Sequence, residues 1–194
     1  ANSDCYKKPL AISFIGSLDW MPNLEALSWF LDEIWTGISN QITDLKFHIA
    51  GRNTPLKIKR LQNERIIVHG EVNSSIDFIN SYPIMVVPIL SGGGMRAKIL
   101  EGMALGKVII TTSIGLEGIE AKDMDEVLIA NTPQEFIDKI LWANNNFNEL
   151  LPIGQRAQVF VAKYFDNYQI ANQIINQYNN LTKKKFFSLE PTFS

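Results

Sequence analysis

The residues with the clearest chemical potential lie in one short stretch, where a run of glycines is followed by two basic side chains. The stretch consists of Gly92, Gly93, Gly94, Met95, Arg96, Ala97 and Lys98. Exposed backbone amides at the start of a helix form a favourable site for an anion, and glycines let the backbone approach it closely. Arginine and lysine add positive charge suited to a diphosphate. The stretch therefore predicts a phosphate-binding site.

A carboxylate extends this pattern. Glu101 follows Lys98 by one helical turn, so the two side chains share one face of the expected helix. A carboxylate in that position is well placed to accept hydrogen bonds from a ribose diol. A glycine-rich turn with a solvated Lys–Glu pair is an equally simple interpretation. The stretch alone leaves both interpretations open.

Two other phosphate-binding motifs are absent from the chain. There is no G-x-x-x-x-G-K-[ST] sequence, which excludes a P-loop nucleotide triphosphatase. The turn that begins at Gly16 and Ser17 does not match G-x-G-x-x-G, which argues against a nicotinamide or flavin dinucleotide site.

The elements that must position these residues follow from the hydrophobic pattern. Short, nearly continuous apolar runs predict strands buried on both faces of a parallel sheet. These runs are residues 10–15, 45–50, 66–69, 84–88, 108–111 and 127–130. Helical spacing or helix-start signals mark the segments between and after them. The expected helices are residues 23–38, 54–63, 74–81, 96–105, 133–148, 151–164 and 167–182.

This alternation predicts an α/β fold: a Rossmann-like, three-layer parallel sheet of about six strands with helices on both faces. Ligands of such sheets bind beyond the carboxyl ends of the strands, near the point where the strand order reverses. Residues directly after strands are therefore further site candidates. They are Gly16, Ser17, Arg52, Gly70 and Val72.

Composition limits the function classes. The formal net charge is −2, from 18 Lys and Arg against 20 Asp and Glu, so no basic excess points to nucleic acid. One cysteine in 194 residues excludes an internal disulfide. The longest apolar run, residues 84–90, is too short to span a bilayer. We expect a cytoplasmic protein with one domain over residues 1–182 and a tail over 183–194.

The tail begins with three lysines followed by two phenylalanines. Such a segment could make weak peripheral contact with an anionic membrane. A solvated tail with a small apolar anchor is the simpler expectation.

Several motifs, taken in order, resemble the C-terminal, donor-binding domain of a bacterial group 1 (family 4-like) GT-B glycosyltransferase of the retaining type. The most specific block is GGGMRAKILEGMALGKV at residues 92–108; FIG, LDWMPN, HIAGRN, TTS and GLEG support it. The resemblance covers about residues 10 to 180. It implies that this domain binds a nucleotide-sugar of the UDP, GDP or ADP type.

The resemblance also implies residue roles. Glu101 matches the family glutamate that holds the ribose hydroxyls, whereas Gly93 stands where a second family glutamate touches the donor sugar. We expect the backbone amides of Gly93 and Gly94 to substitute. Ser17 stands where family members often have a phosphate-binding arginine.

We therefore assign stabilisation of the leaving diphosphate to Arg96 and Lys98. The resemblance places the base near Arg52 and the segment from Gly70 to Val72. With two cations available, we expect neither a metal nor another cofactor.

The implied reaction is transfer of a sugar to an acceptor hydroxyl, as part of bacterial polysaccharide biosynthesis. The acceptor site is expected on an N-terminal domain of the same protein that this chain lacks, so the chain alone should transfer little sugar. A sugar-nucleotide epimerase domain of the same fold is one alternative, and a non-catalytic nucleotide-binding or docking module is another.

Four remaining side chains have simple interpretations. His48, within an expected strand, and His69, at the end of one, are expected to be structural. Glu117 is expected to be a loop carboxylate. Trp20 is equally consistent with stacking on a ligand or partner domain and with packing over the first helix.

Overall fold

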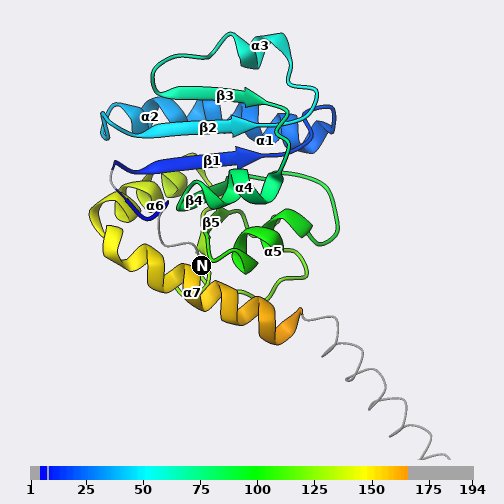
Figure 1. Cartoon of the computed structure of the whole chain (residues 1–194), viewed down its shortest axis with the longest axis vertical. Helices are drawn as coiled ribbons and strands as arrows, with labels where there is room; N and C mark the ends of the chain where they lie inside the picture. The colour runs from blue at the N-terminus through cyan, green and yellow to red at the C-terminus, as the bar shows by residue number, and fades with distance from the viewer. Residues whose placement is uncertain (1–4, 8, 166–194) are drawn as a thin grey trace, which may run out of the picture.

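The computed structural model describes residues 5–7 and 9–165. Its centre is one sheet of six strands in which every pairing is parallel (Figure 1). The strands are β1 (Ala11–Ile15), β2 (Lys46–Ala50), β3 (Ile66–Gly70), β4 (Ile84–Val87), β5 (Val108–Thr111) and β6 (Leu128–Ile129). The predicted α/β fold with six parallel strands is confirmed.

The strand order is β3-β2-β1-β4-β5-β6. The chain builds outward from β1 to β3, then returns to pair β4 with the other side of β1, where Ile12 lies opposite Ile84. The order therefore reverses between β1 and β4. In an open parallel sheet, the carboxyl ends of the strands at this switch point form the usual ligand crevice.

Helices cover both faces of the sheet, as the sequence predicts. They are α1 (Met21–Trp29), η2 (Phe30–Trp35), α2 (Thr36–Ser39), α3 (Leu56–Lys59), α4 (Ser75–Asn80), α5 (Ala97–Ala104), α6 (Pro133–Asn145) and α7 (Phe147–Tyr164). The helix expected over residues 167–182 and the tail expected over 183–194 lie outside the described residues.

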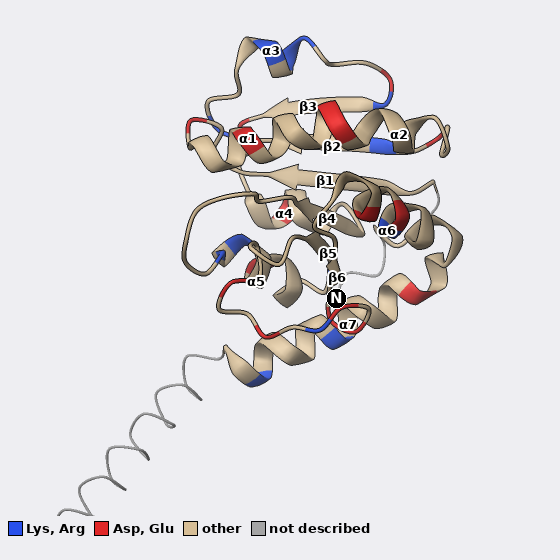
Figure 2. Ribbon diagram, turned by 180° about the vertical axis from the view of Figure 1, so that it is seen from behind, with Lys and Arg blue, Asp and Glu red and all other residues tan. Residues whose placement is uncertain are grey.

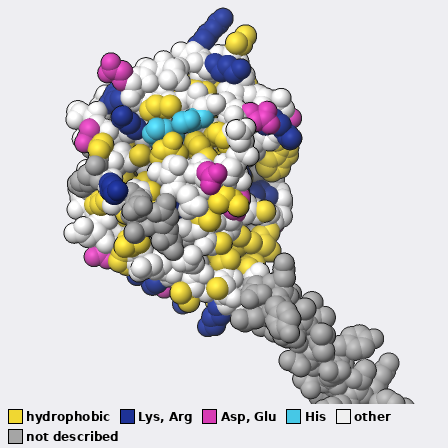
Figure 3. Space-filling model, in the orientation of Figure 1, with side chains coloured by type: hydrophobic (Ala, Val, Ile, Leu, Met, Phe, Trp, Pro, Cys, Tyr) yellow, Lys and Arg dark blue, Asp and Glu magenta, His cyan; other side chains and the backbone are white. Residues whose placement is uncertain are grey.

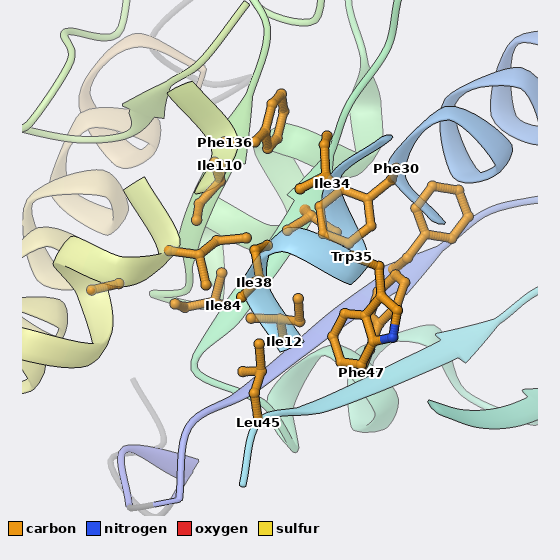
Figure 4. Close-up of a cluster of buried hydrophobic side chains, with 14 of the residues drawn as sticks. Ile12, Phe30, Ile34, Trp35, Ile38, Leu45, Phe47, Ile84, Ile110 and Phe136 are labelled. Atoms are coloured by element: carbon orange, nitrogen blue, oxygen red, sulfur yellow. The ribbon is translucent and has the colours of Figure 1, made fainter. Parts of the chain in front are cut away.

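Alternate residues of each strand serve different cores, because successive side chains point to opposite faces. Ile84 and Val86 of β4 join a core with η2, α2 and α6 (Figure 4). There the ring of Phe30 lies 5.0 Å from that of Phe47 and 6.1 Å from that of Phe136. Met85 and Val87 belong to the opposite core, with α4, α5 and α7. The helices α4 and α5 therefore lie on the same side of the sheet.

The helix predicted over residues 23–38 begins earlier and changes character. It begins at Met21, and its middle third, Phe30–Trp35, has the wider turn of a π-helix. Phe30, Leu31, Ile34 and Trp35 are all buried in that segment. These four side chains join the core on this face of the sheet.

Three other helix predictions were wrong in extent. The helix expected over 133–148 ends at Asn145. The helix expected over 54–63 is reduced to Leu56–Lys59, because only Ile58 is buried there and Leu56 is 69% exposed. The helix expected to begin at residue 151 begins at Phe147 and contains Pro152. The proline lies in the second turn, where its missing N–H leaves only one helical carbonyl without its partner.

The two histidines form a cluster with aromatic rings away from the switch point, on β2 and β3. His48 Nδ1 and His69 Nε2 lie 3.0 Å apart, and the ring of Tyr82 stacks on that of His48 at 4.2 Å. The cluster is set among hydrophobic surface (Figure 3). Burial, followed by His69 and Lys46, lowers the pKa of His48 to about 4; burial also lowers the pKa of His69. These contacts give both histidines structural partners.

This cluster makes the fold sensitive to acid. A histidine with a lowered pKa binds its proton more readily in the unfolded chain, so stability should fall as the pH drops from about 6.5 toward 4. Because His48 is only partly buried, screening reduces the expected loss to about 1 kcal/mol. Chemical denaturation between pH 7 and 4 measures this loss. His48→Gln should flatten the pH dependence, and an unchanged dependence would assign it to other groups.

Candidate functional site

The side chain of Lys98 reaches the switch point itself. Its Nζ donates hydrogen bonds to the Ile15 carbonyl at 3.3 Å and to Asn23 Oδ1 at 2.6 Å. These bonds join the start of α5 to the end of β1 and to α1. The basic start of α5 is visible in Figure 2. Lys98 therefore places a cation between β1 and β4, where the ligand crevice is expected.

Gly16 leaves room for this cation. A Cβ at Gly16 would lie 3.1 Å from Lys98 Nζ and 2.8 Å from Asn23 Nδ2. Any larger residue would therefore displace one of these two side chains. Asn23, which is 4% exposed, also donates from Nδ2 to the Ser17 carbonyl at 2.9 Å. The glycine, the amide and the ammonium group form one packed unit.

Burial makes Lys98 an unusual cation. Removal from water, with a smaller effect of the nearby Arg96, lowers the pKa of Lys98 to about 8. Phe14 lies beneath it, with Nζ 5.3 Å from the ring centroid. At neutral pH the ammonium form still predominates but is poorly solvated. An incoming anion would supply the negative charge that its surroundings lack.

Arg96 has a different environment from the one expected. It is 5% exposed, and its guanidinium donates to the carbonyl groups of its own glycine loop. The acceptors are the carbonyls of Ser91, Gly92, Gly93 and Gly94, at 3.4, 2.5, 2.6 and 2.6 Å. Among the residues that the structure describes, Nε is the one guanidinium nitrogen without a hydrogen-bond partner. The guanidinium thus holds the loop. For the expected contact with a diphosphate, Nε is the only nitrogen of the group that no described residue already engages.

The loop conformation explains its glycines. Gly92 and Gly94 have φ values of 92° and 88°, in the region that disfavours side chains. Arg96 stands directly before α5, in an extended conformation with ψ of 95°. This geometry lets its side chain turn back to the carbonyl groups. The predicted helix therefore begins one residue later, at Ala97.

Glu101 lies where α5 faces the start of α4. Its Oε1 accepts a hydrogen bond from Ser75 Oγ at 3.1 Å. Ser75 also lines a hollow of about 250 Å³ at the carboxyl ends of β1, β2 and β3. The carboxylate is therefore held beside the hollow by one of its two oxygens.

The hollow brings together four residues predicted from separate parts of the sequence. Its lining is Ile15, Gly16, Ser17, Gly51, Arg52, Glu71, Val72 and Ser75. Glu71 lies within the predicted segment from Gly70 to Val72. Ile15, Gly51 and Ser75 were not predicted as site residues; Ile15 and Gly51 could have been found from their positions at strand ends, and Ser75 is the first residue of α4. Gly70, with φ of 69°, turns the chain into this lining. The glycine loop and Met95 are not part of it.

Hydrogen bonds fix the loops above β1 and β2 to each other. Asp19 accepts from Ser17 Oγ at 2.5 Å and from Asn53 Nδ2 at 2.8 Å, while Arg52 donates to Ser17 Oγ at 3.3 Å. The bonds from Ser17 and then Asn53 lower the pKa of the Asp19 carboxyl. Ser17 and Arg52 are thus positioned by a network that needs no ligand.

Glu117 meets the glycine loop from the turn after β5. Its Oε2 accepts from the Gly94 N–H at 2.9 Å. A Cβ at Gly118 would lie 3.6 to 3.9 Å from the Met95 side chain. Glu117 was expected to be a simple loop carboxylate, but its side chain connects the turn after β5 to the glycine loop. Trp20, beside the same loop, is 46% exposed, and the centroid of its ring lies 6.0 Å from Arg96 Cζ.

The sequence does contain one Asp-x-Asp pattern, Asp123-Met124-Asp125. Both carboxylates have cationic partners: Lys139 Nζ lies 2.8 Å from Asp123, and Arg156 Nε lies 2.6 Å from Asp125. Across residues 5–7 and 9–165, no group of three or more His, Cys, Asp or Glu could hold a metal ion. Within the same ranges, no helix is long and apolar enough to span a membrane.

The described residues thus combine a parallel sheet with this switch point, a glycine loop before α5 and a partly buried lysine between β1 and β4. The family model for glycosyl transferases group 1 matches residues 9–146. The chain belongs to this family. The predicted resemblance is therefore confirmed, and the epimerase interpretation is not favoured.

Known relatives agree with this assignment. An uncharacterized 44.6 kDa protein in the cps region of Klebsiella pneumoniae is 25% identical over 178 residues, which cover 86% of this chain and 45% of that protein. The chain thus spans less than half the length of this relative.

Solved structures share the fold at low sequence identity. The C-terminal domain of the group 1 glycosyl transferase LpcC from Francisella tularensis is 17% identical, with a TM-score of 0.66 over 81% of this chain and 87% of that domain. A TarM variant from S. aureus, crystallised with UDP among other ligands, is 18% identical. Its TM-score is 0.71, and the match covers 89% of this chain and 37% of TarM. Anabaena HepE in complex with UDP-glucose is 14% identical, with a TM-score of 0.68 over 90% of this chain and 50% of HepE.

Proposed function

We propose that this chain binds the nucleotide-sugar donor of a glycosyltransferase, with the diphosphate at Lys98. The observation that carries this proposal is the position of Lys98 Nζ, 3.3 Å from the last carbonyl of β1 and packed against Gly16. A buried, poorly solvated cation at the switch point fits a diphosphate. Arg96 then acts by shaping the glycine loop.

The rest of the nucleotide extends from Lys98 along the strand ends. Glu101, one helical turn from Lys98, keeps one oxygen for the ribose hydroxyls. The base enters the hollow between Arg52 and Val72, which lies on the β2 and β3 side of the switch point. The UDP and UDP-glucose in the TarM and HepE structures support a ligand of this class.

In the reaction, the bond between the anomeric carbon and the β-phosphate oxygen breaks, and its electron pair leaves with the nucleoside diphosphate. The acceptor hydroxyl oxygen bonds to the anomeric carbon, and its proton passes to the departing diphosphate oxygen. Lys98 stabilises the negative charge that develops on the diphosphate. We propose that no metal takes part in this step.

The whole protein would complete the site with an N-terminal acceptor domain, in the cytoplasm and in weak contact with a membrane at most. The share of 45% of the Klebsiella relative supports a chain that forms one part of such an enzyme. The cps region that contains this relative supports a role in polysaccharide biosynthesis. By this proposal the present chain binds donor but transfers little sugar alone.

Glu101→Gln tests the ribose contact. The substitution removes charge from an acceptor of hydroxyl hydrogen bonds, and such bonds contribute about 1.5 kcal/mol or more. We expect the Kd for a nucleoside diphosphate to rise about tenfold. Calorimetric titration with UDP, GDP and ADP measures the change. The preference for UDP over its 2′-deoxy analogue should shrink in the variant.

Glu33→Gln is the matched control, because Glu33 is an exposed carboxylate on η2, which packs on the opposite face of the sheet. It should leave every Kd unchanged. Failure of the wild-type chain to bind any of the three nucleotides would refute the proposal and favour a docking module. Equal effects of the two substitutions would remove Glu101 from the site.

A further inference from the structure

We propose that Glu117 binds the hydroxyl groups of the donor sugar. The proposal rests on the function proposed above and adds a specificity-determining residue to it. Glu117 belongs to the turn after β5, 16 residues beyond Glu101 in the sequence. Its carboxylate nevertheless lies at the glycine loop that follows β4, because β4 and β5 are neighbours in the sheet.

The order of the strands places the sugar there. The hollow proposed for the base lies over β1, β2 and β3, and Lys98 lies between β1 and β4. A nucleotide-sugar is a linear arrangement of base, ribose, diphosphate and sugar. With the base and the diphosphate in these places, the sugar continues toward the loops after β4 and β5. Those loops carry Gly93, Gly94 and Glu117.

The carboxylate is positioned but keeps binding capacity. Glu117 Oε2 accepts from the Gly94 N–H at 2.9 Å, and a Cβ at Gly93 would lie 3.9 Å from the same oxygen. The side chain is exposed, and no hydrogen bond or ion pair engages Oε1 among the residues described. One oxygen thus orients the group, while the side chain as a whole stays exposed. A carboxylate oxygen accepts hydrogen bonds from hydroxyl donors and can engage two of them.

The three glycines of the loop have no side chains for this task, and the Ser91 hydroxyl already donates to Glu25 at 2.9 Å. Gly92, Gly93 and Gly94 provide only backbone, and Arg96 already engages their carbonyl groups. Of the loop amides, that of Gly94 is satisfied by Glu117. The expected contact of the Gly94 amide with the sugar is therefore taken by Glu117, and the carboxylate itself is the charged group beside the three glycines.

Calorimetric titration of the chain with UDP, UDP-glucose, GDP and GDP-mannose separates sugar binding from nucleotide binding. For the wild type, at least one sugar nucleotide should bind more tightly than its nucleoside diphosphate. In Glu117→Ala this gain should fall by about tenfold, the size expected for charged hydrogen bonds, while the Kd for the nucleoside diphosphate stays unchanged. Glu117→Gln keeps an acceptor for Gly94 and should also lose most of the gain.

Glu120→Ala is the matched control, an exposed carboxylate three residues further along the same loop. This substitution should leave the Kd values for the nucleoside diphosphates and for the sugar nucleotides unchanged. The backbone amide signal of Gly94 gives a second measurement: sugar nucleotide should shift it more than nucleoside diphosphate does, in the wild type and not in Glu117→Ala.

The outcomes are distinguishable. Equal losses of UDP and UDP-glucose affinity in Glu117→Ala would mean that Glu117 only supports the loop, and would overturn the inference. A wild-type chain that binds nucleotides but gains nothing from either sugar would overturn it as well. Absence of all nucleotide binding would instead refute the proposed function on which it rests.

Discussion

Lys98→Met should abolish most nucleoside diphosphate binding while the chain stays folded. The ammonium group is the cation at the switch point, and a charged hydrogen bond contributes about 1.5–3 kcal/mol, or about a 10- to 100-fold change in Kd. Methionine has a similar length and can pack on Phe14, which lies beneath Lys98. Titration with UDP and GDP measures the loss, and binding of the parent nucleosides should change much less.

The same substitution should change the melting temperature at pH 7 only a little, because removal of a poorly solvated charge opposes the loss of the donor to Asn23 Oδ1. Burial lowers the pKa of Lys98 to about 8, below its value in an unfolded chain, so the charged form disfavours folding. Wild-type stability from this group should therefore rise as the pH increases from about 8 toward 10.5, because the unfolded chain then holds more protons. Lys98→Met lacks this rise, and denaturation between pH 7 and 10.5 compares the two proteins.

Nucleotide affinity should depend on pH in the opposite sense. Above pH 8 the free protein loses the Lys98 proton, so the wild-type Kd should increase as the pH rises. Between pH 7 and 9, below the ionisation of the bases themselves, the Kd of Lys98→Met should change much less. A wild-type Kd that is constant from pH 7 to 10 would contradict a role for the ammonium group in diphosphate binding.

The sequence predicts the scaffold better than the partners of its side chains. The six strands can be predicted directly from the sequence, because neighbouring residues such as Met85 and Val86 are both apolar although they point to opposite faces of the sheet. A helix on the surface is harder to delimit. The region around Ile58 has polar and apolar residues in helical order, yet it packs little on the core and forms a single turn.

The candidate site follows the same division. The strand-end positions of Gly16 and Arg52 place them at one edge once a parallel sheet is assumed, and the hollow brings them together. The orientation of Arg96 cannot be derived in this way, because its acceptors are carbonyl groups whose directions depend on the positive φ values of Gly92 and Gly94. The contact of Glu117 depends on the pairing of β4 with β5.

Arg96 offers the second large effect, because its charge and its shape can be separated. Arg96→Ala removes a buried group that satisfies four carbonyls of the glycine loop. Charged hydrogen bonds of this kind contribute about 1.5–3 kcal/mol each at most, and they are not additive, so we expect a loss of about 2–4 kcal/mol in the free energy of unfolding. Urea denaturation measures this loss, and nucleotide affinity should fall with the order of the loop.

Arg96→Lys is the decisive comparison. Lysine keeps the positive charge but cannot direct two planar nitrogens at separate carbonyl groups, as Arg96 does with Nη1 and Nη2. If Arg96 acts by holding the loop, Arg96→Lys should lose nearly as much stability and affinity as Arg96→Ala. If the guanidinium instead met the diphosphate as a charge, the lysine variant should retain most of the affinity at a reduced stability. Since only Nε is without a partner, the loop-holding outcome is the expected one, and it would leave Lys98 as the cation that meets the leaving diphosphate.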